Sequence, residues 1–189
     1  DAAVAVGFAL SVTLPRAGNL GGGGFILFYD KDTDKVSSID YRSAAPKSSK
    51  SEMFIDNGEV IKFGHLVNAV PGSVAGLLKA HEAQGSLPLS SLLKPAIRLA
   101  KNGFEVTYDL NFVLEWGGES MLVNKASREK FYNKNEEPIG VRTLFRQPNL
   151  AQTLFMISKK GRDAFYKGEI AKWISEESLS SGGLITLND

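Results

Sequence analysis

The side chain with the clearest chemical use is Arg42, which directly follows the strand-like residues 39–41 and precedes a turn that ends at Pro46. A guanidinium group is planar, and its N–H donors form a fixed fork that matches a carboxylate. The nearby proline restricts the backbone of the turn and so helps to fix the direction of the side chain. Arg42 is therefore a candidate for binding a ligand carboxylate, with a surface or ion-pair role as the alternative.

The other nucleophiles and bases are less suited to catalysis. Ser73 directly follows Gly72, whereas a nucleophile elbow needs the order Gly-x-Ser-x-Gly. We therefore expect Ser73 to be the N-cap of a helix. His81 falls on the apolar face of that helix, where a packed core or boundary histidine is expected, and His65 lies in a loop with no evident partner. Neither histidine supports a Ser-His-Asp arrangement.

Four consecutive glycines at positions 21–24 could form a backbone nest for a phosphate. A phosphate-binding loop, however, runs from strand to helix and ends in Gly-Lys-Ser or Gly-Lys-Thr, and a dinucleotide-binding loop has the same direction. Here the glycines run from a helix into a strand and end in Gly24-Phe25. We expect them to serve positive φ angles and close backbone packing beneath an adjoining site.

The elements that must position these residues are several helices and at least one hairpin, which is an α+β arrangement. Residues 2–13 predict a buried helix that Pro15 ends, and residues 25–29 and 35–41 predict the hairpin. A helix begins at Pro71-Gly72-Ser73 and ends at Gly85, because positions 74, 77, 78 and 81 share one face. Further helices are predicted up to Asn102, over 107–123, from Leu150 to Gly161 and around 170–174, while 124–140 has no helical period.

Composition excludes several classes of protein. The 189 residues are about one domain's length, and 22 basic against 21 acidic residues leave a net charge of only +1. A nucleic-acid or anionic-membrane partner is therefore not expected. The chain has no cysteine and two histidines, which excludes thiolate sites and makes a multi-histidine zinc site improbable. No cofactor is implied. The longest apolar stretch, residues 2–14, is too short and too mixed to span a bilayer.

Blocks along the whole chain, taken together, resemble the gamma-glutamyltranspeptidase family. The blocks that carry the resemblance are Asp1-Ala-Ala-Val-Ala-Val-Gly7, Pro15-Arg-Ala-Gly-Asn-Leu-Gly-Gly-Gly-Gly-Phe25, Asp40-Tyr-Arg-Ser-Ala-Ala-Pro46, Val70-Pro-Gly-Ser-Val-Ala-Gly-Leu77, Pro95-Ala-Ile-Arg-Leu-Ala-Lys-Asn-Gly103, Gln147-Pro-Asn-Leu-Ala-Gln-Thr-Leu154, Phe165-Tyr-Lys-Gly168 and Gly182-Gly-Leu-Ile-Thr186. The resemblance implies an N-terminal nucleophile hydrolase with an αββα sandwich, made as a precursor that cleaves itself into a large and a small subunit.

The resemblance further implies that residues 1–189 are a single segment of the large subunit, truncated at both ends, rich in helices and carrying the hairpin. The family's nucleophile is the threonine at the start of the small subunit, and no threonine here lies in the family's Thr-Thr-His-Tyr context. The segment alone is thus expected to be inactive. The expected partners are the small subunit, glutathione or other gamma-glutamyl compounds, and an amino-acid or peptide acceptor, in a periplasmic or secreted location.

One substrate-binding residue of the family maps onto this sequence. The arginine of its Asp-x-Arg-Glu-x-Ala-Pro motif, which binds the alpha-carboxylate of the glutamyl group, corresponds to Arg42, and Ser43 replaces the glutamate. The expected function is that of a gamma-glutamyltransferase and glutathione hydrolase acting through a threonyl acyl-enzyme. Two alternatives stay open: a related acylase or poly-gamma-glutamate-processing enzyme, and a non-catalytic structural module.

Overall fold

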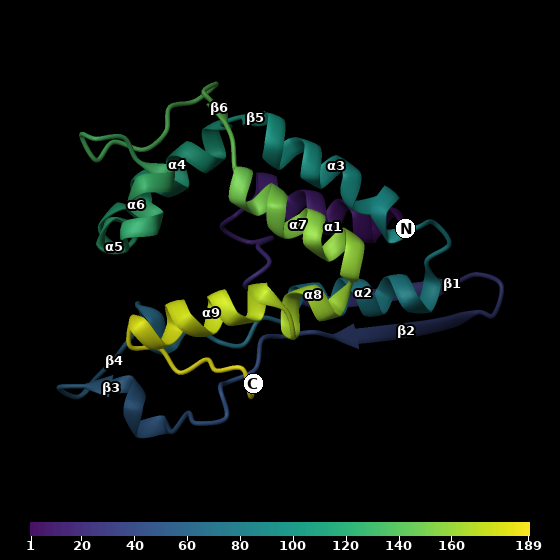
Figure 1. Ribbon diagram of the computed structural model, residues 1–189, viewed down its shortest axis with the longest axis horizontal. Helices are drawn as coiled ribbons and strands as arrows, with labels where there is room; N and C mark the ends of the chain where they lie inside the picture. The colour runs from purple at the N-terminus through teal and green to yellow at the C-terminus, as the bar shows by residue number, and fades with distance from the viewer.

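The computed structural model describes all residues, 1–189, and arranges most of the helices in two tiers (Figure 1). One tier contains α1 (Ala2–Thr13), α3 (Leu89–Asn102) and α7 (Pro148–Lys160). The other contains α2 (Ser73–Gln84), α8 (Arg162–Tyr166) and α9 (Glu169–Ser180), with the main hairpin alongside α2. The bounds of α1, α2, α3 and α7 confirm the helices predicted from the spacing of apolar residues, and the α+β class is confirmed.

The main hydrophobic core lies where the two tiers meet. Its fully buried side chains sit at helical spacing and belong to α1, α2, α3 and α7: Phe8, Val12, Val74, Leu93, Leu154 and Ile157. Burying such side chains contributes about 1.5–3 kcal/mol each. The expectation that α1 is buried all round is wrong, because Val6 and Leu10 on its other face are exposed.

The predicted hairpin is present as β1 (Phe25–Asp30) and β2 (Lys35–Asp40), paired antiparallel from Phe25 opposite Asp40 to Asp30 opposite Lys35. In the turn, the carboxylate of Asp30 accepts hydrogen bonds from Thr33 Oγ1 (2.8 Å) and from the Asp32 amide (3.0 Å). These bonds lower the pKa of Asp30. The turn is therefore fixed by local polar contacts, so the register of the two strands is fixed as well.

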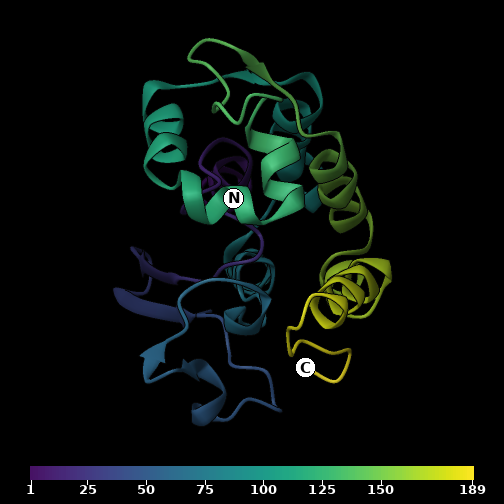
Figure 2. The same ribbon diagram turned by 90° about the vertical axis from the view of Figure 1, so that its left-hand side faces the viewer.

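Residues 104–145 form an arm with a small core of its own at one end of the upper tier (Figure 2). It holds α4 (Tyr108–Trp116), α5 (Gly118–Val123) and α6 (Lys125–Phe131), and its base is the strand pair β5 (Phe104–Glu105) and β6 (Leu144–Phe145). The single helix predicted over 107–123 is divided at Gly117. The segment 124–140, for which no helix was expected, begins with α6 because Asn124 Oδ1 caps it by accepting from the Ser127 amide at 3.0 Å.

The remaining elements are short and lie between β2 and α2. They are the 3₁₀ turns η1 (Ser51–Phe54) and η2 (His65–Val67) and the two-residue strands β3 (Ile55–Asp56) and β4 (Glu59–Val60). Asn57 and Gly58 join these strands with φ angles of 49° and 83°, as a type I′ turn requires. None of the helices is both long enough and apolar enough to cross a lipid bilayer.

Candidate functional site

Arg42 lies between two backbone pairings that fix its main chain. On one side Tyr41 donates its amide to Gly24 O at 2.9 Å, and on the other Val70 donates its amide to Ala44 O at 2.8 Å. The amide of Arg42 itself donates to Asp40 Oδ1 at 2.9 Å. The end of β2 is therefore tied to the glycine segment before β1 and to the segment that leads into α2.

The guanidinium group of Arg42 is not bound to any acid of the chain. The side chain is exposed, forms no ion pair, and places Cζ 6.0 Å from the centre of the Phe25 ring. A cation at this distance from an aromatic face is attracted to it. The fork of N–H donors is thus free of any partner acid within the chain, and the binding of a carboxylate by Arg42 stays a prediction.

Glycines surround the backbone of residues 41–43 at very short range. A Cβ atom at Gly23 would lie 2.5 Å from Ser43 N, and one at Gly72 would lie 2.0 Å from Tyr41 O. Side chains of any kind are excluded at both positions unless the backbone moves. The expected close packing by the glycine segment is confirmed, but the expected positive φ is wrong, because none of Gly21–Gly24 adopts it.

The start of α2 is held by groups far away in the sequence. Gly22 O accepts from the amides of Gly72 (2.8 Å) and Ser73 (3.0 Å), and Tyr166 Oη accepts from the Ala75 amide at 3.1 Å. The prediction that Ser73 caps this helix is wrong: Gly72 is the N-cap and no side chain of the cap residue bonds the first turn. The hydroxyl of Tyr166 satisfies the Ala75 amide, which a capping serine could otherwise have served, and the carbonyl of Gly22 satisfies the two amides that precede it in the chain.

Tyr166 also donates its hydroxyl to Pro71 O at 2.8 Å, so one side chain joins α8 to both sides of the helix start. Burial of this hydroxyl raises its pKa, against smaller lowering contributions from the Ala75 amide and from Arg162. Tyr41, Phe25 and Tyr166 were all missed as site residues. Each lies inside a block that carries the family resemblance, and Tyr41 and Phe25 directly adjoin the more conspicuous Arg42 and Gly24.

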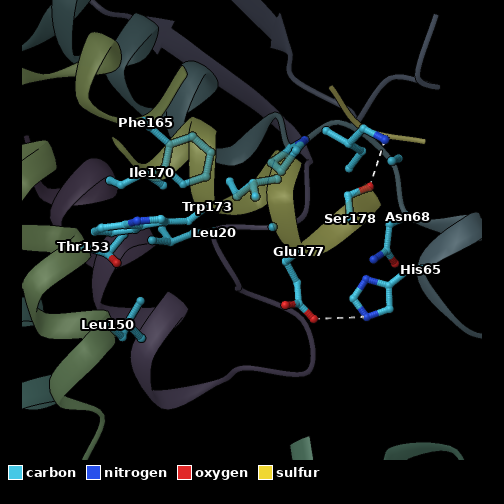
Figure 3. Close-up of a pocket in the computed structure, with 15 residues that line it drawn as sticks. Leu20, His65, Asn68, Leu150, Thr153, Phe165, Ile170, Trp173, Glu177 and Ser178 are labelled. Atoms are coloured by element: carbon cyan, nitrogen blue, oxygen red, sulfur yellow. Dashed lines mark hydrogen bonds and ion pairs between the residues drawn. The ribbon is translucent and has the colours of Figure 1, made fainter. Parts of the chain in front are cut away.

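A hollow of about 570 Å³ between α7, α9 and the segments around Leu20 and His65 does not include Arg42. Its apolar end is formed by side chains such as Leu20, Leu150 and Trp173, and its polar end by His65 and Glu177 (Figure 3). His65 Nε2 lies 3.7 Å from Glu177 Oε1 and 3.3 Å from Asn124 Nδ2, so this histidine has partners that the sequence did not indicate. It joins α9 to the arm.

No catalytic serine or metal centre is assembled within the chain. His81 is a boundary residue, as expected, and its Nε2 lies 2.8 Å from Leu87 O at the end of α2. Ser73 has neither histidine among its hydrogen-bond partners, and no group of three or more acidic or histidine side chains could hold a metal ion. The candidate site is therefore an exposed, unpaired arginine whose backbone is closely packed, and no nucleophile is assembled beside it.

Comparison with known proteins agrees with this architecture. The sequence model of the gamma-glutamyltranspeptidase family matches residues 1–189. The glutathione hydrolase proenzyme of Escherichia coli K12 is 41% identical, with all of this chain covering 33% of the relative. The crystal structure of the Helicobacter pylori gamma-glutamyltranspeptidase superimposes with a TM-score of 0.94 at 36% identity, over 99% of this chain and 55% of that one. The solved structure of the Pseudomonas nitroreducens gamma-glutamyltranspeptidase complexed with L-DON superimposes with a TM-score of 0.89 at 39% identity, over 98% of this chain and 55% of that one.

The chain spans about a third of the length of the curated relatives it matches and about half of the matched chains of known structure. The likeness extends along the whole chain and includes the segments that surround Arg42. On the family match, the identities and the shared N-terminal nucleophile hydrolase fold, the chain belongs to the gamma-glutamyltranspeptidase family.

Proposed function

We propose that residues 1–189 form part of the large subunit of a gamma-glutamyltransferase and glutathione hydrolase, in which Arg42 binds the alpha-carboxylate of the gamma-glutamyl donor. The observation that carries this proposal is the guanidinium group itself, which is exposed, pairs with no acid of the chain, and extends from a backbone that two other segments hold in place. Relatives named as glutathione hydrolase proenzymes support glutathione as the donor.

The reaction needs a nucleophile from outside this chain. In the proposed mechanism, the side-chain oxygen of an N-terminal threonine attacks the gamma-carbonyl carbon of the donor and its own amine takes the proton. The C–N bond then breaks, the leaving amine receives the proton, and a glutamyl ester remains on the threonine. Water or the amine of an amino acid or peptide attacks this ester and releases the product. Arg42 contributes by fixing the donor through two parallel N–H···O bonds.

Exposed apolar faces indicate where the rest of the precursor packs. Phe25 and Leu27 point to the same side of the hairpin and are 65% and 76% exposed, with Tyr29 continuing the row. Val6 and Leu10 form a second exposed apolar strip on α1. Contiguous apolar surface of this kind marks an interaction site. We assign the hairpin face, which borders Arg42, to the subunit that carries the threonine, and place the assembled protein in the periplasm or outside the cell.

The decisive variant is Arg42→Ala in the full-length precursor. Removing one partner of a desolvated charge pair costs about 2–5 kcal/mol, so the KM for glutathione should rise by about 30- to 5,000-fold. Self-cleavage should persist, because the donor carboxylate takes no part in it. Arg42→Lys keeps the positive charge but loses the forked pair of N–H donors, so its KM should lie between those of the wild type and of Arg42→Ala. A KM for glutathione that stays unchanged in Arg42→Ala would contradict the proposal.

The preference among gamma-glutamyl amides is a separate question, and Ser43 is the residue that raises it. It is half-buried beside Arg42 and takes the place of an acid in the family's motif. Rates measured side by side on glutathione, a cephalosporin-type amide and poly-gamma-glutamate should be highest for glutathione. A higher rate on either of the others would favour the related acylase or polymer-processing activity.

A further inference from the structure

Gly76 is an interior residue of α2, where a glycine is unfavourable unless the space it leaves is needed. Glycine destabilises a helix interior by about 1 kcal/mol relative to alanine. At this position a Cβ atom would lie 2.1 Å from Cγ, 2.4 Å from Cβ and 2.5 Å from Cδ1 of Tyr41. The space is therefore filled by the side chain of the residue that directly precedes Arg42.

The atoms of Tyr41 that Gly76 contacts are those closest to its backbone. Rotation about χ1 would move Cγ and Cδ1 but not Cβ, so a side chain at position 76 requires that the backbone of Tyr41 and the start of α2 move apart. The far end of the same ring lies against Gly24, where a Cβ atom would be 2.9 Å from Oη and 3.0 Å from Cζ. The ring is thus held at its base by α2 and at its tip by the segment before β1.

We propose that Tyr41 and Gly76 are positioning residues for Arg42: the ring of Tyr41, seated on Gly76, sets the place from which the guanidinium reaches the donor carboxylate. This inference rests on the proposed role of Arg42. Displacement of a binding group by about 1 Å can cost a factor of about 100 in an enzyme. Moving the backbone next to Arg42 should therefore weaken donor binding even though Arg42 itself is unchanged.

The test compares two helix glycines in the full-length, self-cleaved enzyme. Gly76→Ala should raise the KM for glutathione by about 10- to 100-fold with a smaller change in kcat. Gly7→Ala is the matched control, because its Cβ would meet Cδ2 of Leu77, the far end of a flexible side chain, at 2.6 Å in the contact between α1 and α2. Its KM should stay within about 2-fold of the wild-type value, since Leu77 can rotate away. Equal KM values in the two variants would overturn the inference.

Combining Gly76→Ala with Arg42→Ala separates positioning from general damage. If Gly76 acts through Arg42, Gly76→Ala should raise the KM no further once the guanidinium is gone. If the KM of the double variant exceeded that of Arg42→Ala by the whole factor that Gly76→Ala causes alone, the positioning role would be overturned. An Arg42→Ala enzyme with an unchanged KM would instead overturn the proposed function, so the two failures are distinguishable.

Gly24→Ala is the milder second variant, and it decides the matter if Gly76→Ala does not fold. It pushes only on the tip of the Tyr41 ring, and Gly24 has an ordinary negative-φ backbone that alanine can adopt. We expect about a 3- to 10-fold rise in KM, abolished in the Arg42→Ala background. A KM equal to that of the wild type would overturn the inference.

Discussion

Replacing Tyr166 by phenylalanine removes a single oxygen that joins α8 to the start of α2. This oxygen donates to Pro71 O at 2.8 Å and accepts from the Ala75 amide at 3.1 Å. A typical hydrogen bond contributes about 0.5–1.5 kcal/mol, and a donor left unpaired away from water costs about 1–3 kcal/mol. Because the hydroxyl is partly buried and bonds two partners, we expect the free energy for opening the first turn of α2 to be about 1–3 kcal/mol lower in the variant than in the wild type.

Hydrogen exchange of the Ala75 amide in the full-length protein measures this loss directly. A loss of 1–3 kcal/mol should speed exchange by about 5- to 150-fold, since each 1.36 kcal/mol is a factor of ten. Tyr29→Phe is the matched control, because its hydroxyl bonds Asp34 Oδ1 at 2.9 Å on the exposed hairpin. Its effect should be within about 0.5 kcal/mol of zero. Exchange at Ala75 that is equally slow in both variants would refute the role of the Tyr166 hydroxyl in holding the first turn of α2.

Two further predictions concern alkaline pH and the arm. Burial raises the pKa of Tyr166 and of Tyr132, so the folded state holds these protons more tightly than the unfolded state, whose value is 10.0. The stability that these protonated hydroxyls contribute is complete below pH 10 and is lost as the pH rises through the folded-state pKa values. The free energy of unfolding should therefore fall above pH 10. This fall should be less steep in the Tyr132→Phe/Tyr166→Phe double variant. Thr107→Ala removes the Oγ1 that accepts from the Leu110 amide at 3.2 Å at the start of α4. Hydrogen exchange should show that α4 becomes less stable by about 1 kcal/mol. Thr153→Ala, inside α7, is the control and should not destabilise its helix.

The long helices were predictable because their apolar residues recur on one face. Val74, Leu77 and Leu78 are buried on α2 as their spacing indicated, and Gly85 ends the helix. Short elements were not predictable in this way. The seven residues of α6 have no buried side chain, so no apolar period marks them, and their start depends on a cap by Asn124 that only local geometry reveals.

The chemistry of the site was predictable only in part. Arg42 could be chosen as a candidate from its residue type, its turn and its family motif, and its role stays a prediction. The close packing of the glycine segment could be predicted from its composition. Ser73 was misassigned because the capping preference of serine is a local tendency, whereas the amides of α2 are satisfied by Gly22 and Tyr166. Contacts between residues about 35 to 90 positions apart leave no periodic signal in a single sequence, so the packing of the Tyr41 ring on Gly76 could not be predicted.

The support of Arg42 also sets when this part of the molecule can become ordered during synthesis. The segments around residues 22, 41 and 72 emerge from the ribosome early, yet the side chain that secures the start of α2 belongs to residue 166. Closing so long a loop costs entropy before any contact repays it. The contacts that hold the backbone next to Arg42 are thus complete only after residue 166 has been made.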